Sequence, residues 1–148
     1  MSFLPISLCI ENKKILFIGG GNVCIHKIAA IKQFTSNISI VSKEFLPEVR
    51  AYGFPCIQKA YEASDLHGYS LVYACTNDSK LHIRIVEDAH KLGILVNVAD
   101  NTPLCDFISP AIYKHENISV AVSSGGTDVK KAVRLRNAIK KIFNQLSL

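Results

Sequence analysis

The sequence lacks the marks of several protein classes. Its five cysteines are scattered and none forms a C-x-x-C pair, so neither a disulfide framework nor a zinc site is indicated. No apolar run approaches the ~20 residues that a membrane span requires. The first residues also lack the basic start and the long apolar run of a signal peptide. We therefore expect a cytoplasmic protein with buried, reduced thiols, no membrane contact and no metal site.

Acidic residues are too few to balance the basic ones, and the formal net charge is +5. Basic charge attracts nucleic acid, anionic membranes or polyanionic small molecules. No aromatic platform or recognition motif accompanies the charge, so we do not expect a nucleic-acid partner, and a solvated helix face is the simplest interpretation. Much of the excess comes from residues near the end of the chain: Lys130, Lys131, Arg134, Arg136, Lys140 and Lys141.

The clearest functional pattern lies near the N-terminus. Four apolar residues, 15–18, predict a strand buried on both faces of a parallel sheet, and three glycines, residues 19–21, precede a helical pattern. In this context G-x-G indicates dinucleotide binding. Gly19 allows a tight turn, Gly21 lets the backbone approach a pyrophosphate, and the helix N-terminus presents free N–H groups. Cys24 stands where the pattern has its third glycine, so a glycine turn that binds nothing is the alternative.

Two charged residues follow the second predicted strand, residues 38–41, about 20 residues after the glycines. Lys43 could contact a 2′-phosphate, which would favour NADP. Glu44 could accept a hydrogen bond from a ribose hydroxyl, which would favour NAD. The sequence leaves both possibilities open.

The whole pattern predicts an α/β fold. A Rossmann-type parallel sheet with helices on both faces would occupy residues 1–112, and a short strand-plus-helix segment would occupy residues 113–148. His82 and His90, on a predicted helix of the first part, are expected to be exposed. Further strands are expected at residues 56–59, 71–74, 94–98 and 118–123, and helices at residues 45–52, 81–92 and 129 to about 146.

Polar residues follow the fourth and fifth predicted strands, at the sheet edge where open α/β sheets bind their ligands. Thr76 is a candidate cofactor contact, whereas Asn77 and Asp78 are better explained as caps of the next helix. Asp100 follows the fifth strand. There a carboxylate could move a proton, and the alternative is that it only caps a turn.

Five short motifs follow one another along the chain: L-P-I at residues 4–6, I-G-G-G-N-V at 18–23 with Lys27, N-V-A-D at 97–100, C-D-F-I-S-P-A at 105–111 and V-A-V-S-S-G-G-T at 120–127. Together they resemble precorrin-2 dehydrogenase, which is also the N-terminal module of siroheme synthase. The resemblance covers nearly the whole chain, as a short form that lacks the family's C-terminal helical domain.

The resemblance implies an NAD-binding Rossmann domain and a dimerisation segment in which two chains intertwine as a homodimer. It implies oxidation of precorrin-2, a polycarboxylate tetrapyrrole, to sirohydrochlorin with NAD as cofactor, in siroheme biosynthesis. Some members also insert iron. The residues that match the family by position are Asn22 and Val23 at the glycine turn, Lys43 and Glu44 after the second strand, the catalytic aspartate Asp100, and Ser124 near the tetrapyrrole.

One departure from the family lies after the G-G-T motif, where Asp128 and Val129 replace the usual S-P. This changes the entry to the last helix and affects the expected substrate contacts. The alternative to an enzyme is a non-catalytic module or partner subunit that binds NAD or a tetrapyrrole. Ferrochelatase activity stays open at this point.

Overall fold

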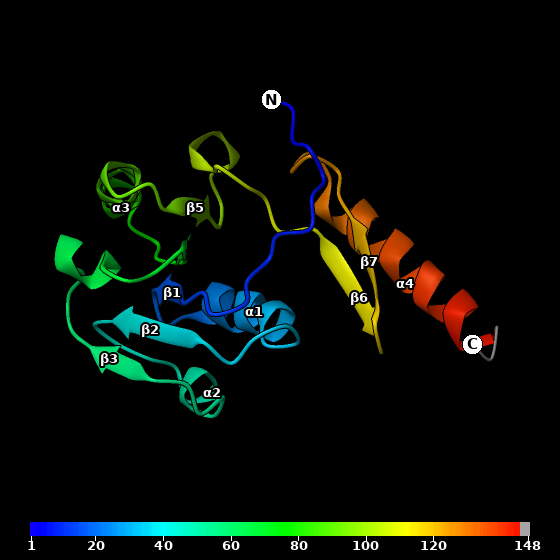
Figure 1. Ribbon diagram of the computed structural model, residues 1–148, viewed down its shortest axis with the longest axis horizontal. Coiled ribbons are helices and arrows are strands. Elements are labelled where there is room, and N and C mark those ends of the chain that lie inside the picture. Colours follow the sequence, from blue (N-terminus) through cyan, green and yellow to red (C-terminus); the bar gives the residue numbers. More distant parts are fainter. Residues whose placement is uncertain (146–148) are drawn as a thin grey trace. The chain divides into compact units, whose positions relative to one another are not determined.

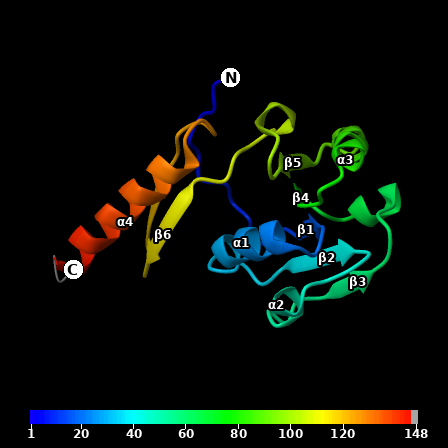
Figure 2. The ribbon, with the colours of Figure 1, turned by 180° about the vertical axis from the view of Figure 1, so that it is seen from behind.

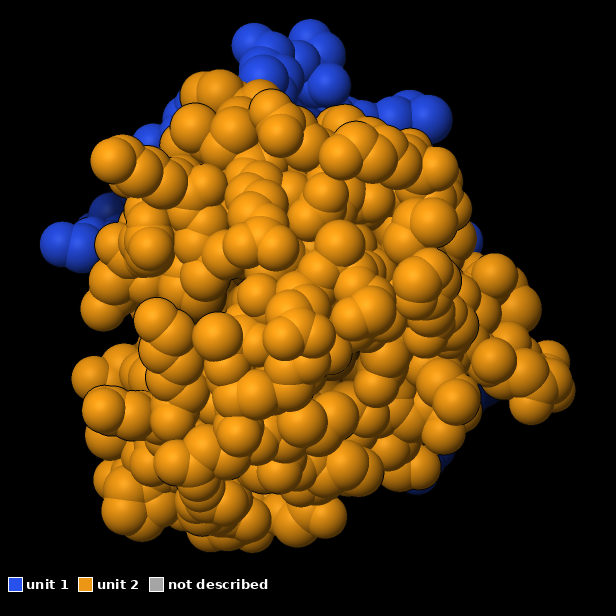
Figure 3. Space-filling view, turned by 90° about the vertical axis from the view of Figure 1, so that its left-hand side faces the viewer, with its two compact units in different colours: residues 1–7, 108–148 blue, residues 8–107 orange. Residues whose placement is uncertain are grey.

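The computed structural model describes residues 1–145 and divides into two compact units (Figure 1, Figure 3). The sheet unit comprises residues 8–107, and the hairpin unit comprises residues 1–7 and 108–148. The sequence pattern places the end of the nucleotide-binding domain at residue 112, and that functional boundary stays a prediction.

The sheet unit is built on five parallel strands in the order β3-β2-β1-β4-β5. Their order reverses between β1 and β4, so the carboxyl ends of these two strands form a topological switch point, where ligands of such sheets bind. The predicted Rossmann-type sheet is therefore confirmed. The strands are β1 (Ile15–Ile18), β2 (Ile38–Ser42), β3 (Cys56–Gln58), β4 (Leu71–Ala74) and β5 (Leu95–Val98).

Helices cover both faces of this sheet, which explains why β1 is apolar without alternation. Phe17 and its face of β1 pack against α1 (Asn22–Ile31) and α2 (Pro47–Arg50). Leu16 and its face pack against α3 (Ser79–Lys91) and the 3-10 turn η1 (Ala63–Leu66). A second 3-10 turn, η2 (Thr102–Leu104), follows β5. Each large side chain buried in this way contributes roughly 1.5–3 kcal/mol.

The helix α3 shows where sequence reasoning succeeded and where it failed. Asp78 caps it as predicted, because its side chain accepts hydrogen bonds from the N–H groups of Lys80 and Leu81 at 3.0 and 3.1 Å. The prediction that His82 is exposed was wrong, because its side chain is buried and only 2% of the residue is exposed. His82 precedes Ile85 by three residues and so lies on the same stripe of the helix, which faces the sheet.

The hairpin unit holds an antiparallel strand pair, β6 (Ala111–His115) and β7 (Ile118–Val122), and the helix α4 (Val129–Gln145). Both strands lie against α4 (Figure 2). The sequence predicted β7 and the helix but missed β6, so the expected strand-plus-helix segment is a hairpin plus helix. The predicted helix end at Leu146 lies outside the described residues.

Candidate functional site

The glycine turn lies at the carboxyl end of β1, and two of its glycines are required by the fold. Gly19 has φ +118°, and a Cβ there would lie 2.6 Å from the carbonyl oxygen of Cys75. A Cβ on Gly20 would collide with the carbonyl oxygen of Glu44. These contacts press the turn against the segments that follow β2 and β4, so only glycine fits at either position.

Gly21 is different, because a Cβ there would meet no heavy atom within 4 Å. It forms the N-cap of α1, and no side chain of residues 1–145 caps this end of the helix. Asn22 and Val23, which begin α1, are both exposed, so this end of the helix faces open space. A helix N-terminus of this kind suits an anion such as a pyrophosphate. The turn thus fits a dinucleotide, with Gly19, Gly21, Asn22 and Val23 as the residues that would hold its phosphates.

The end of β2 lies next to this turn, because the N–H of Leu46 donates to the carbonyl oxygen of Gly20 at 2.9 Å. Lys43 and Glu44 occupy the bend between the strand and that contact, and both are exposed. The structure therefore brings both candidate ribose contacts to the same place, beside the glycine turn. The structure favours neither cofactor, so the choice between NAD and NADP stays open.

Thr76 follows β4 and borders the glycine turn from the other side, since its backbone nitrogen would lie 2.9 Å from a Cβ on Gly19. Its hydroxyl oxygen accepts the N–H of Asp78 at 3.2 Å, which fixes the short loop that leads into α3. Thr76 is half-buried. The structure thus groups this candidate with the glycine turn.

Asp100 follows β5 at the same edge of the sheet. The N–H of Ala99 donates to the carbonyl oxygen of Ala74 at 3.0 Å, so the chain before Asp100 is tied to the end of β4. The Asp100 side chain is 69% exposed and is free to meet a ligand. The observed arrangement therefore offers an accessible carboxylate at the same edge of the sheet as the glycine turn, which suits proton transfer.

His82 lies close to two of these candidates, Thr76 and Asp100. The sequence analysis did not name it as a site residue. Its Nε2 lies 2.9 Å from the carbonyl oxygen of Thr76, and its Nδ1 lies 3.7 Å from Oδ1 of Asp100. The spacing of His82 from Ile85 and Ala89 on the buried stripe of α3 was the available signal. A polar residue on an apolar stripe points to a buried polar contact.

One cation and three thiols also lie at or near this edge. Burial lowers the pKa of the half-buried Lys27 ammonium below its ordinary 10.5, partly offset by Cys75 and Cys105. A hydrogen bond with Cys75, together with burial, raises the pKa of the Cys24 thiol above its usual range. Burial also raises the pKa of Cys105. Cys24 and Cys105 are therefore held neutral and are poor nucleophiles.

The prediction of buried thiols was only partly correct. Cys24 and Cys75 are buried, Cys56 and Cys105 are half-buried, and Cys9 is exposed. The apolar residues around Cys9 in the sequence suggested burial, yet the side chains of Leu8 and its apolar neighbours Leu4 and Ile6 are themselves exposed. All five cysteines are free.

Ser124 belongs to the hairpin unit, apart from the other candidates, which all lie in the sheet unit. Its hydroxyl oxygen accepts the N–H of Asp128 at 3.0 Å, and its carbonyl oxygen accepts the hydroxyl of Thr127 at 2.6 Å. Asp128 in turn accepts the N–H of Lys131 at 2.8 Å and so caps α4. Asp128 therefore starts the last helix in place of the family's S-P.

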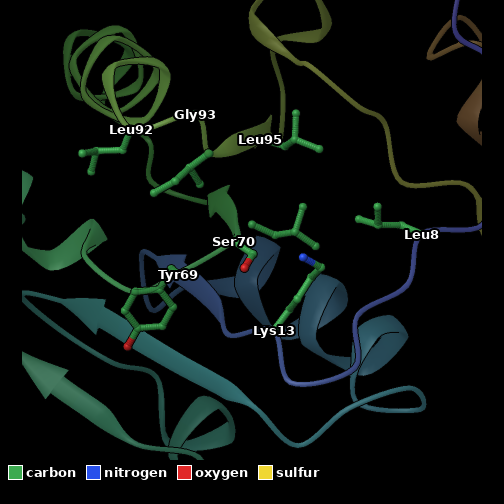
Figure 4. Close-up of a pocket in the computed structure, with 9 residues that line it drawn as sticks. Leu8, Lys13, Tyr69, Ser70, Leu92, Gly93 and Leu95 are labelled. Atoms are coloured by element: carbon green, nitrogen blue, oxygen red, sulfur yellow. The ribbon is translucent and has the colours of Figure 1, made fainter.

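A cavity of the sheet unit lies at the opposite edge of the sheet (Figure 4). Tyr69 and Ser70 precede β4 and Leu95 begins β5, so the cavity borders the amino ends of the strands. No glycine-turn residue lines it, and we assign it no role. Over residues 1–145, no His, Cys, Asp and Glu side chains gather as a metal-binding group. No helix within that range is long and apolar enough to cross a membrane.

Comparison with known proteins shows the family of the chain. Residues 6–111 match the family described as "Putative NAD(P)-binding". This match spans most of the chain, and the chain belongs to that NAD(P)-binding family. The predicted nicotinamide dinucleotide cofactor is thereby confirmed at the level of the family.

The most informative relatives are siroheme synthases. The chain is 33% identical over 147 residues to siroheme synthase 1 of Cronobacter sakazakii, covering 97% of this chain and 31% of that protein. It is 34% identical over 142 residues to the siroheme synthase of Azotobacter vinelandii, covering 93% and 30%. The chain thus spans less than a third of the length of these relatives.

A solved structure supports the fold. The chain superimposes on SirC, a precorrin-2 dehydrogenase, with a TM-score of 0.81 over 94% of this chain and 70% of that one. The sequence identity is 21%, so this likeness speaks for the fold alone. The predicted fold class is confirmed, with β6 as the strand that the sequence analysis omitted.

Proposed function

We propose that the chain is an NAD-dependent dehydrogenase that oxidises precorrin-2 to sirohydrochlorin in siroheme biosynthesis. One observation carries the proposal: an open glycine turn and an accessible carboxylate, Asp100, lie at the same edge of one parallel sheet. The likeness to siroheme synthases over nearly the whole chain supports the choice of substrate.

Dehydrogenation removes a hydride and a proton from the substrate. NAD accepts the hydride. Gly21, Asn22 and Val23 would bind its phosphates, while Thr76 would border it from the end of β4. Either Lys43 or Glu44 would contact the adenosine ribose. Asp100 would accept the proton as a general base.

The substrate is a polyanion, and the net charge of +5 favours its approach at long range. We propose that Ser124, at the start of the loop before α4, contacts the tetrapyrrole. Its hydroxyl oxygen already accepts one backbone N–H, so the remaining O–H could donate to a substrate carboxylate. This role assigns substrate binding to residues 113–148 and cofactor binding to residues 1–112.

We also propose that the protein acts as a cytoplasmic homodimer. In the hairpin unit the described part of α4 buries only Ala132, while Leu135 and Ile142 are about half exposed. A hairpin and one helix form too small a core to stand alone. A second copy of the hairpin unit would cover this apolar surface. A monomer in light scattering at micromolar concentration would contradict the dimer.

The test is an anaerobic assay with purified protein, NAD and enzymatically prepared precorrin-2. The absorbance of NADH and the spectrum of the tetrapyrrole are followed together. We expect NADH and sirohydrochlorin to appear at equal rates. Ferrous iron added afterwards tests chelation, because siroheme formation faster than in a protein-free control would establish the ferrochelatase activity.

A non-catalytic module that binds NAD or a tetrapyrrole is the second candidate. The observation that favours it is the 69% exposure of the Asp100 side chain, since a general base works best where water is excluded. NAD binding in the same assay with no turnover at any precorrin-2 concentration would support this candidate against the dehydrogenase.

A further inference from the structure

The imidazole of His82 is buried at a place where burial is costly. It lies on the apolar stripe of α3 with Ile85 and Ala89, and only 2% of the residue is exposed. A buried polar ring is tolerated only when its nitrogens find partners. Nε2 of His82 has a backbone carbonyl as its partner, whereas Nδ1 faces the carboxylate that we assign to proton transfer and can bond to it only when a proton lies between them.

The first contact fixes which nitrogen carries the proton. Nε2 lies 2.9 Å from the carbonyl oxygen of Thr76, and a carbonyl oxygen can only accept, so Nε2 carries the hydrogen and donates it. The carbonyl is itself held in place, because Thr76 and the N-cap Asp78 are linked by a hydrogen bond at 3.2 Å. The ring therefore has one anchored nitrogen and one orientation.

The second contact, between Nδ1 of His82 and Asp100, has no hydrogen that either atom could donate. In the neutral ring, with Nε2 protonated, Nδ1 is an acceptor, and it faces Oδ1 of Asp100 at 3.7 Å. A carboxylate is also an acceptor, so no hydrogen bond joins the two atoms in this state, and 3.7 Å is longer than a hydrogen bond. One added proton between the two atoms would allow a hydrogen bond.

We propose that His82 is a positioning residue for Asp100, and this inference rests on the proposed dehydrogenase function. The hydride leaves the substrate with both bonding electrons and goes to NAD, while the proton goes to the Asp100 carboxylate. The new O–H of Asp100 then donates to Nδ1 of His82, whose Nε2–H stays on the Thr76 carbonyl. His82 thereby accepts the hydrogen of the Asp100 carboxyl group after the transfer and fixes the orientation of that group.

Two substitutions of His82 test the roles of its two ring nitrogens one at a time. In His82→Gln the amide nitrogen can reach the position of Nε2 and keep the bond to Thr76, but nothing replaces Nδ1. In His82→Asn the amide lies near the position of Nδ1 and can contact Asp100, but the bond to Thr76 is lost. His90→Gln is the matched control, because His90 is an exposed histidine of the same helix that contacts Asp106 at 3.0 Å.

We expect His82→Gln to lower kcat by about 10- to 100-fold, which is part of the 10²–10⁴ that general acid–base catalysis contributes. The KM for NAD should stay within twofold of the wild type. His82→Asn should recover at least half of the lost kcat on a logarithmic scale, and His90→Gln should leave kcat unchanged. The proposal is overturned if His82→Gln keeps kcat within twofold of the wild type, or if Asn restores nothing.

A measurement that needs no turnover completes the test. The ¹⁵N signals of His82 in the wild-type protein report which nitrogen carries hydrogen. We expect a protonated Nε2, and an unprotonated Nδ1 whose signal moves in Asp100→Asn, since that amide can donate to it. A protonated Nδ1 in the neutral ring would overturn the inference even if His82→Gln failed to fold. Absent turnover with these signals as expected would instead count against the dehydrogenase.

Discussion

The two units of the chain bury their apolar residues very differently. In the sheet unit both faces of the sheet are covered, and Leu16, Phe17 and Val72 are fully buried. In the described part of the hairpin unit Ala132 is the only buried apolar residue. Several large apolar side chains of that unit are more than 40% exposed: Met1, Leu4, Ile6, Ile118, Val129, Leu135 and Ile142.

This difference follows from the architecture. A parallel sheet between two layers of helices buries its strands completely, whereas one helix covers only one face of a two-stranded ribbon. The sheet unit therefore buries its apolar residues within one chain, whereas the hairpin unit leaves much of its apolar surface exposed. The proposed cofactor contacts lie in the first unit, and the proposed dimer contacts lie in the second.

The largest effect on stability is expected in the core of the sheet unit. Phe17 is fully buried and stacks on Tyr73 with ring centroids 4.8 Å apart. Phe17→Ala should lower the free energy of unfolding by about 3–5 kcal/mol, as measured by urea denaturation. Phe34→Ala is the control, because Phe34 is 38% exposed. A loss below 1 kcal/mol for Phe17→Ala would contradict the described core.

The next prediction compares Gly19, which the fold requires, with Gly21, which faces the proposed ligand. Gly19→Ala should destabilise the protein by about 1–3 kcal/mol, because it forces a Cβ against the Cys75 carbonyl at positive φ. Gly21→Ala should lower the melting temperature much less, because only the N-cap preference for glycine over alanine is lost. It should weaken NAD binding by about tenfold, since its Cβ would enter the open space before α1. Thermal melts and NAD titrations distinguish the two. Equal melting temperatures for both variants would refute this distinction.

In the hairpin unit a substitution should change assembly more than folding. Leu135 and Ile142 are two helical turns apart on the same face of α4, and both are about half exposed. Leu135→Asp should shift a dimer towards monomer at micromolar concentration, as measured by light scattering. Asn137→Asp adds the same charge on the same helix and should have no such effect. If Leu135→Asp leaves the dimer unchanged, the dimer interface does not include this face of α4.

The smallest effect concerns the charge of Lys27. Burial lowers its folded-state pKa below 10.5, so between the two values the unfolded chain binds more protons than the folded one. Its contribution to stability therefore rises with pH in the window just below 10.5. Lys27→Met should be more stable than the wild type at neutral pH, and the difference should shrink as the pH rises through this window. Urea midpoints at several pH values measure it, and a constant difference would refute the assignment.

The sequence was sufficient for the parts of the fold that depend on local pattern. The apolar run of β1, the glycine turn and the cap Asp78 all follow from residue types at fixed spacing. The hairpin was less accessible, because β6 is half-buried and does not alternate cleanly. Its turn also requires Glu116 at φ +48°, which residue type alone does not signal.

The candidate site was predictable only in its separate segments. Residues at the ends of parallel strands meet at one edge, so Thr76 and Asp100 could be named from sequence. The link between them could not, because the contact of His82 with both is tertiary and its histidine type suggested exposure. For Ser124 the sequence supplied a match to a family position, and its role in substrate binding stays a prediction.

The most direct test of the account compares Asp100→Ala with the wild type in one anaerobic cuvette with NAD and precorrin-2. If the glycine turn binds the cofactor independently of the base, Asp100→Ala should keep an NAD dissociation constant within twofold of the wild type and form NADH at least 100-fold more slowly. Wild-type turnover by Asp100→Ala would contradict the assignment of the base, and loss of NAD binding would contradict the separation of the two roles.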